Sequence, residues 1–341
     1  MKILITGGCG FIGSNVAEYF IKKGDDVTII DNLSRNGTEK NLEWLKTNYP
    51  TIKFVKADMR YDQKILDREV ENKDAVLHFA GQTAVTTSFV NPREDFEINA
   101  LGTFNILEAI RNSKSKPALL YSSTNKVYGG MEDIKTHEVN GRYEYVDFPN
   151  GIPENRLLDF HSPYGCSKGC ADQYVRDYAR MYGLKTVVFR QSCIYGYRQF
   201  GVEDQGWVAW FTIATLFNKA LTIYGDGKQV RDVLFIEDLC KAYDLALQNI
   251  NKTAGKVYNI GGGKLNRMSL LELIKFLEKQ FNKKIITKFD QWRPGDQPVF
   301  VCDISKAKTE FGWEPEVSVE NGIQKLSEWV KQNKELFKGL Y

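Results

Sequence analysis

The sequence predicts an α/β protein built on a Rossmann-type doubly wound parallel sheet, with a smaller C-terminal lobe. Short apolar runs alternate with amphipathic stretches along the first half of the chain, as in parallel strands joined by helices on both faces of a sheet. The first such unit also carries a glycine-rich turn between its strand, residues 2–6, and its helix, residues 14–24. At 341 residues the chain is long enough for a large sheet and an added lobe.

The glycine-rich turn has the spacing G-x-x-G-x-x-G. Gly7 lets the chain turn sharply off the strand, Gly10 lets bare backbone approach a pyrophosphate, and Gly13 lets the helix pack close to the sheet. The helix points its first N–H groups at the phosphates, and Phe11 and Ile12 belong to this predicted phosphate site. Glycine is common in turns for purely structural reasons. Here, however, a strand precedes the glycine-rich turn and a helix follows it, and this context is typical of a dinucleotide-binding site.

Acidic residues end the second and third predicted strands. Asp31 stands at the tip of a strand over residues 26–31, where a carboxylate can accept from both ribose hydroxyls of an adenosine, and this acid favours NAD over NADP. Asp58 ends the strand over residues 52–58 and lies along the same crevice. Two roles stay open for Asp58: it receives the adenine amino group, or it caps the helix over residues 61–70.

The next strand and helix add further candidates. Ala80 and Gly81 follow the strand over residues 75–79 and leave room for a nicotinamide ribose. The apolar side of the helix over residues 96–112 is expected to consist of Phe96, Ala100, Phe104, Leu107 and Ile110. Asn99 lies among them and needs a hydrogen-bond partner.

The candidate chemistry is concentrated at the end of the fifth strand and on a later helix. Ser122, Ser123 and Thr124 reach the carboxyl edge of the sheet, while Tyr164 and Lys168 stand four residues apart and share a helix face. A phenol is a poor base at neutral pH, but a nearby ammonium and a positively charged nicotinamide favour its phenolate. Thr124 can share the same substrate oxygen, so the site can take a proton while hydride leaves the carbon. A Tyr–Lys pair alone is an ordinary surface feature, and the dinucleotide turn is what favours the catalytic interpretation.

Composition argues against several function classes. The net charge of +3 is small and evenly spread, so we expect neither nucleic acid nor a membrane as a partner. No run of about 18 apolar residues occurs and the N-terminus is already a core strand, so we expect a cytoplasmic protein. Six cysteines without a C-x-x-C pair, and only three histidines, favour no metal site. The cysteines are expected to be small buried apolar side chains in a reducing compartment.

Together these motifs resemble the extended short-chain dehydrogenase/reductase family of nucleotide-sugar epimerases and dehydratases. The resemblance rests on TGGCGFIG, the YSST strand, Tyr164-x-x-x-Lys168, RDVLFIEDL and RPGDQ, and it covers nearly the whole chain. Within the family, DNLSR, YSSTNKVYG and GKQVRDVL resemble the CDP-tyvelose 2-epimerases, also called CDP-paratose 2-epimerases.

The resemblance implies tightly held NAD, with Thr124, Tyr164 and Lys168 as the catalytic set. Further cofactor contacts that it implies are Asn32, Ser34, Arg35, Met59, Asn99 and Ser122, and Tyr164 and Lys168 themselves are expected to contact the cofactor as well. The substrate contacts that it implies are Thr124, Asn125, Arg231 and Arg293. In this family the two arginines grip a nucleotide diphosphate, a task that suits planar bidentate donors.

The residues after Thr124 bear on the reaction. The family's dehydratases place an Asp–Glu pair there to protonate a departing hydroxyl, whereas this chain has Asn125 and Lys126, which disfavours dehydration. The resemblance therefore implies an epimerase of a CDP-hexose at carbon 2, acting through a transient keto sugar and hydride return to the opposite face. A UDP-glucose 4-epimerase-type enzyme and a non-catalytic NAD-binding regulatory protein stay open. We expect a homo-oligomer, a dimer or a tetramer.

The chain divides into two expected parts. Residues 1–190 form the NAD-binding domain, with a strand and helix near residues 230–262 returning to it, and residues 191–341 form mainly the nucleotide-sugar lobe. The strand over residues 185–190 is expected to close the sheet, and the helix over residues 319–333 to pack as an amphipathic cover. Three aromatic side chains of the second part can stack on a base or fill core: Trp207, Trp210 and Phe211.

Overall fold

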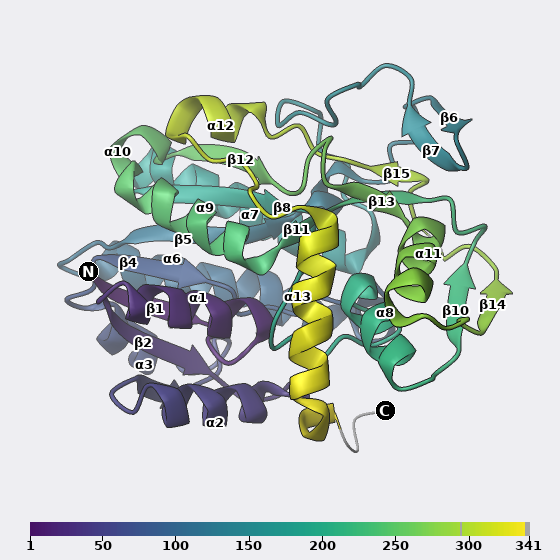
Figure 1. Cartoon of the computed structure of the whole chain (residues 1–341). Helices are drawn as coiled ribbons and strands as arrows, with labels where there is room; N and C mark the ends of the chain where they lie inside the picture. The colour runs from purple at the N-terminus through teal and green to yellow at the C-terminus, as the bar shows by residue number, and fades with distance from the viewer. Residues whose placement is uncertain (294, 338–341) are drawn as a thin grey trace.

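The computed structural model describes residues 1–293 and 295–337. Its centre is a 7-stranded parallel sheet with helices on both faces, which confirms the predicted doubly wound α/β class (Figure 1). The strands are, in order across the sheet, β12 (Lys256–Ile260), β8 (Thr186–Gln191), β5 (Ala118–Thr124), β4 (Ala75–His78), β1 (Lys2–Thr6), β2 (Asp26–Asp31) and β3 (Lys53–Lys56). The order reverses between β1 and β4, so the loops after these strands open a crevice at the carboxyl edge.

Two hydrophobic cores lie on opposite faces of the sheet. One face is covered by α1 (Phe11–Lys22), α2 (Thr38–Asn48) and α9 (Ile236–Gln248), and the other by α3 (Gln63–Val70), α6 (Gly102–Asn112) and α7 (Ser162–Tyr182). Ile3 and Ile5 enter the first core and Leu4 enters the second. Because both faces are buried, the strands are continuously apolar.

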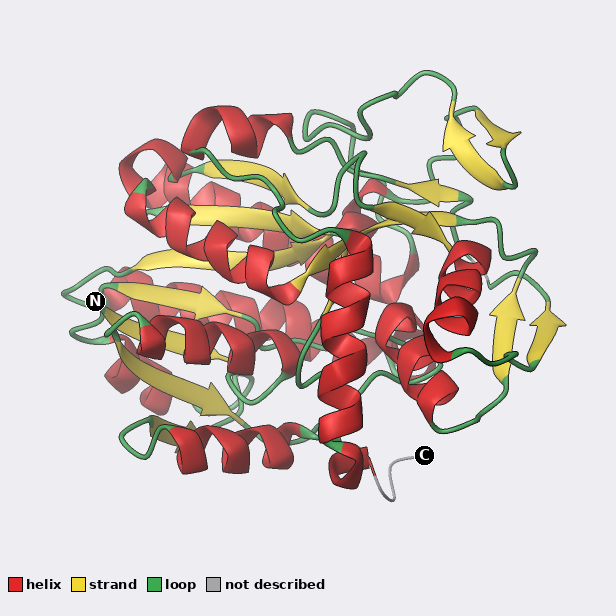
Figure 2. Cartoon of the chain, in the orientation of Figure 1, coloured by secondary structure: helices red, strands yellow, loops and turns green. Residues whose placement is uncertain are grey.

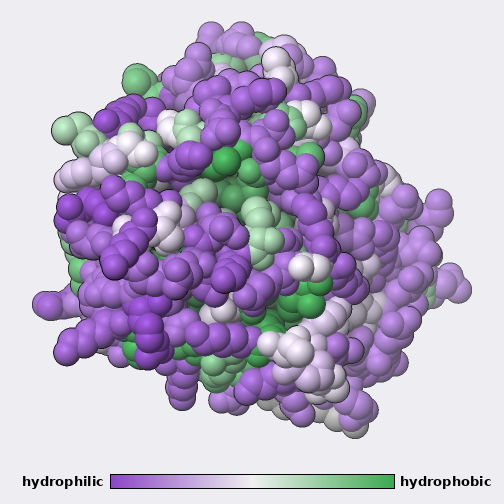
Figure 3. All heavy atoms as spheres, turned by 90° about the vertical axis from the view of Figure 1, so that its left-hand side faces the viewer, coloured by the Kyte–Doolittle hydropathy of each residue, from purple (hydrophilic) through white to green (hydrophobic). Residues whose placement is uncertain are grey.

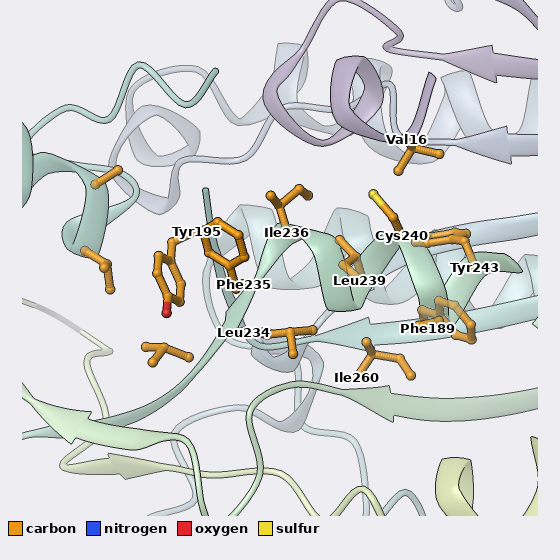
Figure 4. Packing of buried hydrophobic residues seen from close by; sticks show 14 of the residues in the cluster. Val16, Phe189, Tyr195, Leu234, Phe235, Ile236, Leu239, Cys240, Tyr243 and Ile260 are labelled. Carbon is orange, nitrogen blue, oxygen red and sulfur yellow. The ribbon is translucent and has the colours of Figure 1, made fainter. Parts of the chain in front are cut away.

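The predicted strand over residues 185–190 is present as β8, but it does not close the sheet. β12 pairs with β8 in parallel and forms the edge. The chain reaches this edge through α9, whose apolar side chains pack against α1 and β8 (Figure 4). Tyr243 of α9 lies with its ring centroid 4.8 Å from that of Phe189 in β8, and Cys240 points toward Val16.

The C-terminal lobe lies beyond the carboxyl ends of the sheet strands (Figure 2). Its strands are β9 (Cys193–Tyr195), β10 (Leu221–Tyr224), β11 (Val230–Phe235), β13 (Arg267–Ser269), β14 (Thr287–Asp290) and β15 (Val299–Phe300), with the hairpin β6 (Thr136–Val139) and β7 (Arg142–Tyr145) beside them. Its helices are α8 (Trp207–Leu216) and α11 (Leu270–Phe281). Ser269 and Glu272 form a capping box that fixes the start of α11.

The remaining helical segments connect these parts. They are α4 (Val85–Val90), α5 (Pro92–Phe96), η1 (Glu97–Leu101), η2 (Asn125–Tyr128), α10 (Ile250–Thr253), α12 (Ser305–Phe311), α13 (Val319–Gln332) and η3 (Lys334–Phe337). α13 buries Ile323, Leu326 and Val330 against α8 and β11, so the predicted amphipathic cover is confirmed.

The predicted apolar side of the helix over residues 96–112 is wrong at two positions. Phe96 is 53% exposed and Phe104 is 37% exposed. The π-helical turn η1 shifts the helix register after Phe96. Phe104 lies beyond this turn on α6, where its ring packs at 5.7 Å from that of Tyr174 and 6.5 Å from that of Tyr178 on α7. The same turn carries Asn99 into the interior.

The cysteine and aromatic predictions are also resolved. Cys9, Cys240 and Cys302 are buried as predicted, but Cys166 is exposed on the outer side of α7, so the prediction is wrong there. The aromatic side chains of α8 pack with the larger hydrophobic core, where Phe211 is buried and Trp207 and Trp210 lie against it. Phe211 therefore fills core, whereas stacking of the partly buried Trp207 and Trp210 on a base stays a prediction.

The face at the amino ends of the sheet strands is mostly hydrophilic (Figure 3). A cavity of about 850 Å³ opens there, lined in part by Lys2, Asp26, Lys73 and Asp74. It lies at the opposite end of the sheet from the crevice. Within residues 1–293 and 295–337 no helix is long and apolar enough to cross a membrane.

Candidate active site

The glycine-rich turn joins β1 to α1 through contacts that exclude larger residues. Gly7 has a φ of 66°, and a Cβ there would lie 2.6 Å from the backbone nitrogen of Ala80. A Cβ on Gly13 would lie 2.1 Å from the Gly7 carbonyl oxygen, so Gly13 brings the helix close to the turn itself. α1 starts at Phe11 after Gly10, with no capping side chain and no acidic residue in its first turn. The positive end of α1 is therefore open to an anion, with Ile12 in its first turn.

Asp31 connects this turn to the end of β2. Its Oδ2 accepts from the Cys9 N–H at 3.0 Å, and its Oδ1 accepts from the Leu33 N–H at 2.8 Å. Burial raises the pKa of the Asp31 carboxyl, and the two N–H donors counteract this. Each carboxylate oxygen has a second lone pair. Asp31 can therefore hold the turn and still accept from a ribose hydroxyl.

Asp58 is engaged by two neighbours at the end of β3. It accepts from Asn32 Nδ2 at 2.9 Å and from the Arg60 guanidinium at 3.0 and 2.9 Å. The bonds from Arg60 lower the pKa of Asp58 to about 2, although burial opposes this. Its alternative role as a helix cap is wrong, because α3 follows Asp62 at its N-cap position. The next residue, Met59, packs in the second core.

Asn99 braces the loop after β4 against α7. Its Oδ1 accepts from the Gln82 N–H at 2.9 Å, and its Nδ2 donates to Ser167 Oγ at 3.0 Å. A Cβ on Gly81 would lie 2.9 Å from Asn99 Oδ1 and 3.8 Å from Lys168 Nζ. The small residues after β4 therefore make room for Asn99 and Lys168 themselves, and the cofactor contacts of Ala80 and Asn99 stay predictions.

Tyr164 and Thr124 face each other where α7 meets the end of β5. Tyr164 is 8% exposed and Thr124 is 7% exposed. Thr124 Oγ1 donates to Asn125 Oδ1 at 3.3 Å and accepts from the Lys126 N–H at 3.2 Å. Burial raises the pKa of Tyr164 to about 12, while the Thr124 hydroxyl and the Arg35 charge lower it and Asp95 raises it. The cation that favours the phenolate in this structure is therefore Arg35, whereas the sequence pointed to the ammonium of Lys168.

Lys168 lies one helical turn beyond Tyr164 and binds the backbone of the same strand. Its Nζ donates to the Ser122 carbonyl oxygen at 2.5 Å and lies 4.4 Å from the centre of the Tyr121 ring. Burial lowers the pKa of Lys168 to about 7, and the charges of Asp172 and Asp95 counteract this. Tyr164 and Lys168 thus share a helix face and meet successive parts of β5.

Arg35 crosses the crevice from the predicted adenosine side. Its guanidinium donates to Thr83 Oγ1 at 2.6 Å and to Gln205 Oε1. Burial lowers the pKa of Arg35, and Tyr164 and Asp31 raise it, so its charge acts on both ends of the crevice. Ser34 stays on the adenosine side, where its N–H donates to Asn32 Oδ1 at 3.0 Å. The sequence did not indicate the reach of Arg35.

The two arginines predicted to bind diphosphate have separate partners in the C-terminal lobe. Arg231 of β11 pairs with Asp296 at 2.5 Å. Arg293 pairs with Asp204 at 3.0 Å and lies 3.9 Å from the centre of the Tyr224 ring. Asp296, the partner of Arg231, lies only three residues after Arg293 in the sequence. The segment between β14 and β15 therefore carries Arg293 and also binds Arg231.

Sequence reasoning missed a buried ion pair behind the site. Arg190 of β8 and Asp172 of α7 are 2% and 0% exposed in their side chains, with Nε and Oδ2 2.9 Å apart. Ser123 donates to the same carboxylate at 2.8 Å, which ties the residue before Thr124 to α7. An arginine inside an otherwise apolar strand was the available signal, because a buried charge requires a partner. No group of three or more metal-ligating side chains occurs within residues 1–293 and 295–337.

Comparison with known proteins places this site in a family. The family described as GDP-mannose 4,6 dehydratase matches residues 4–326. The chain is 50% identical to the CDP-paratose 2-epimerase of Salmonella typhi over 97% of this chain and 99% of the relative.

Two solved structures share the whole fold. A dTDP-glucose 4,6-dehydratase double mutant from Streptomyces venezuelae with NAD bound has a TM-score of 0.86 and 28% identity, and covers 100% of each chain. A UDP-glucose 4-epimerase from Thermus thermophilus in complex with NAD has a TM-score of 0.82 and 29% identity, over 98% of this chain and 100% of that one. The chain therefore belongs to the GDP-mannose 4,6 dehydratase family of extended short-chain dehydrogenases/reductases.

Proposed function

We propose that the chain is an NAD-dependent nucleotide-sugar epimerase that inverts carbon 2 of a CDP-hexose. The observation that carries the proposal is 50% identity, across nearly the full length of both chains, to a CDP-paratose 2-epimerase. Asn125 and Lys126 stand where elimination would need a carboxylic acid and a carboxylate, which supports epimerisation over dehydration.

The residues around the crevice fit NAD. The uncapped start of α1 offers free N–H groups to a pyrophosphate, and Asp31 offers acceptor capacity to a ribose while its charge repels a 2′-phosphate. When bound, NAD accepts a hydride from the sugar and returns it. Gly7, Gly10 and Gly13 would hold its phosphates.

The chain's own residues handle the proton of the sugar hydroxyl. Tyr164 Oη takes this proton and later returns it, and Thr124 Oγ1 shares the same substrate oxygen. Because both side chains are nearly buried, substrate binding removes water from the reacting hydroxyl. The guanidinium of Arg35 provides the positive charge that favours a phenolate at Tyr164. The ammonium of Lys168 binds the Ser122 carbonyl oxygen and so holds the end of β5 beside Tyr164.

Two other functions compete with this one. A carbon-4 epimerase of a UDP-sugar would use the same three residues, and the similarity to a UDP-glucose 4-epimerase supports it. A non-catalytic NAD-binding regulator would not need Thr124, Tyr164 and Lys168 together in a buried site. Turnover of any nucleotide sugar excludes the regulator.

Isotope tracing separates the two epimerases. We expect a CDP-hexose with deuterium at carbon 2 to keep its label, to invert that carbon, and to react more slowly, whereas deuterium at carbon 4 has little effect. In deuterated water the inverted carbon should gain no solvent deuterium, because the hydride leaves and returns at one carbon. Mass and NMR analysis of sugars from CDP-, UDP-, GDP- and dTDP-hexoses measures this. If carbon 4 is inverted instead, and deuterium at carbon 4 slows turnover, the protein is a carbon-4 epimerase of a UDP-sugar and this proposal is wrong.

The protein is proposed to act in the cytoplasm as a homo-oligomer. Its six cysteines are all free, which fits a reducing compartment. Exposed apolar side chains on α6 and α7, among them Phe104, Tyr174, Met181 and Tyr182, offer a face to a second copy. We expect light scattering to give a dimer or a tetramer, and the double variant Tyr174→Glu with Met181→Glu to give smaller species. A monomeric wild-type protein would contradict the proposed oligomer.

A further inference from the structure

Asp95 is a buried carboxylate close to the proposed active site. It belongs to α5 and is 1% exposed. The nearest basic residue in its own segment does not pair with it, because Arg93 donates to Glu97 at 2.8 Å. A buried carboxylate needs hydrogen-bond donors that replace its lost hydration. The partners of Asp95 must therefore come from other parts of the chain.

Two buried side chains bind the Asp95 carboxylate. Its Oδ1 accepts from Asn99 Nδ2 at 3.2 Å, and its Oδ2 accepts from Ser167 Oγ at 2.5 Å. Asn99 Nδ2 also donates to Ser167 Oγ at 3.0 Å. The three side chains are 1%, 1% and 2% exposed, and we call them the Asp95 cluster. A hydroxyl that donates over about 2.5 Å is typical of an ionised acceptor.

The charge of Lys168 also favours the ionised form of Asp95. Burial raises the pKa of Asp95, whereas the Ser167 hydroxyl, the Lys168 charge and the Asn99 amide lower it. Burial lowers the pKa of Lys168, and the charges of Asp172 and Asp95 raise it. The carboxylate and the ammonium therefore stabilise each other's charged forms.

An ionised Asp95 determines which way the Asn99 amide points. Such a carboxylate only accepts hydrogen bonds, so Asn99 turns its Nδ2 toward Asp95. Its Oδ1 then points the other way and accepts from the Gln82 N–H at 2.9 Å. The reverse orientation would set the amide oxygen against the carboxylate and remove this acceptor from Gln82. Asp95 therefore fixes the backbone at Gln82 through Asn99.

The Asp95 cluster connects the two elements that hold the proposed proton-handling groups. In the loop after β4, Thr83 Oγ1 accepts from the Arg35 guanidinium at 2.6 Å. In α7, Ser167 stands three residues after Tyr164, and its Oγ lies 3.2 Å from the Tyr164 carbonyl oxygen. Through its two partners Asp95 therefore joins the loop that binds Arg35 to the part of α7 that carries Tyr164.

We propose that Asp95 is a positioning residue, which holds the loop after β4 against the start of α7 through Asn99 and Ser167. Because it is 1% exposed, it acts through these two side chains rather than by contact with the sugar. Its carboxylate keeps the Arg35 guanidinium and the Tyr164 phenol in a fixed arrangement. Its effect on turnover rests on the proposed function, whereas the hydrogen-bonded arrangement does not.

The test first removes the carboxylate. Asp95→Leu keeps the branched shape but gives Asn99 and Ser167 no acceptor, so we expect kcat to fall by about 10- to 100-fold with little change in KM. Exchange of the Gln82 N–H in deuterated water, measured by mass spectrometry on the purified protein with its cofactor, should become about tenfold faster or more. Asp67→Leu removes an exposed carboxylate from α3 and is the matched control, which should change neither readout.

A second pair of variants moves the carboxylate instead of removing it. Asn99→Asp sets two carboxylates against each other and should lower kcat at least as much as Asp95→Leu does. Adding Asp95→Asn leaves one carboxylate and one amide in the cluster, with the carboxylate beside the Gln82 N–H. We expect this double variant to recover kcat to within about fivefold of wild type and to slow the exchange of Gln82 again. This comparison does not require Asp95→Leu to fold.

Three results would overturn the proposal. The first is normal kcat and normal Gln82 exchange in Asp95→Leu. The second is a lower melting temperature of that variant with normal kcat, because Asp95 would then only stabilise the fold. The third is a double variant that is no more active than Asn99→Asp. If Gln82 exchange responds as expected but wild-type protein turns over no nucleotide sugar, only the proposed function fails.

Discussion

Replacing Tyr164 by Phe is expected to reduce turnover by about a hundredfold or more while the fold is retained. The substitution removes only the phenolic oxygen, and the ring keeps its buried place in the first turn of α7. Thr124 remains but has a hydroxyl of very high pKa, so it cannot replace the phenol as a base. The loss should fall on kcat, because the proton moves in the transition state rather than on binding.

The control for this variant lies on the same helix. Tyr182→Phe removes a phenolic oxygen from a side chain that is 51% exposed and far along α7 from Thr124, so its activity should equal that of wild type. Bound NAD and the melting temperature should be unchanged in both variants. Near-normal turnover by Tyr164→Phe would mean that another group takes the proton.

The parts of the fold that the sequence predicts well are those set by local pattern. The strands were recognisable because both of their faces are buried, and the first strand, turn and helix because each glycine has its own steric reason. The order of the strands across the sheet was harder to predict from the sequence. β12 pairs with β8 although 64 residues or more of chain separate them, and no local pattern at residues 185–190 distinguishes an edge strand from an inner one.

The candidate site shows the same division. The end of β5 and the Tyr164–Lys168 spacing follow from strand and helix periodicity. The hydrogen-bond partners of the site residues cannot be predicted in this way, because they are distant in sequence. Arg35 binds Gln205, 170 residues away, and Arg231 binds Asp296, 65 residues away. The π-helical turn at Glu97–Leu101 was also invisible, because its sequence fits an ordinary helix while its tertiary contacts through Asn99 favour the wider turn.

Replacing Lys168 by Met is expected to lower activity and raise stability at the same time. Without the ammonium we expect turnover to fall by about a hundredfold or more, because the bond to the Ser122 carbonyl oxygen that holds the end of β5, and with it Thr124, in place is lost. Stability should respond in the opposite direction, because burial lowers the pKa of Lys168 to about 7, well below its ordinary value of 10.5. The folded protein therefore binds the Lys168 proton less tightly than the unfolded chain does.

The sign of the pH dependence follows from this difference. Between about pH 7 and pH 10.5 the unfolded chain carries the proton more often, so the Lys168 contribution to the free energy of unfolding rises with pH. Below pH 7 both states are protonated, and the full cost of a buried ammonium remains. In nucleotide-free protein, Lys168→Met should exceed wild type by about 1 to 3 kcal/mol at pH 6, after the loss of the Ser122 and Tyr121 contacts. The difference should shrink toward pH 10.

Urea unfolding at pH 6, 8 and 10 measures this difference, with Lys185→Met as the control. Among the residues that the structure describes, the Lys185 ammonium donates only to Asn251 Oδ1 on the surface, so its replacement should change stability little at any pH. A Lys168→Met protein that is less stable than wild type at pH 6, or whose stability difference does not change with pH, would show that Lys168 keeps an ordinary pKa in the folded protein. In that case its ammonium is solvated or fully paired, and burial does not destabilise its charged form.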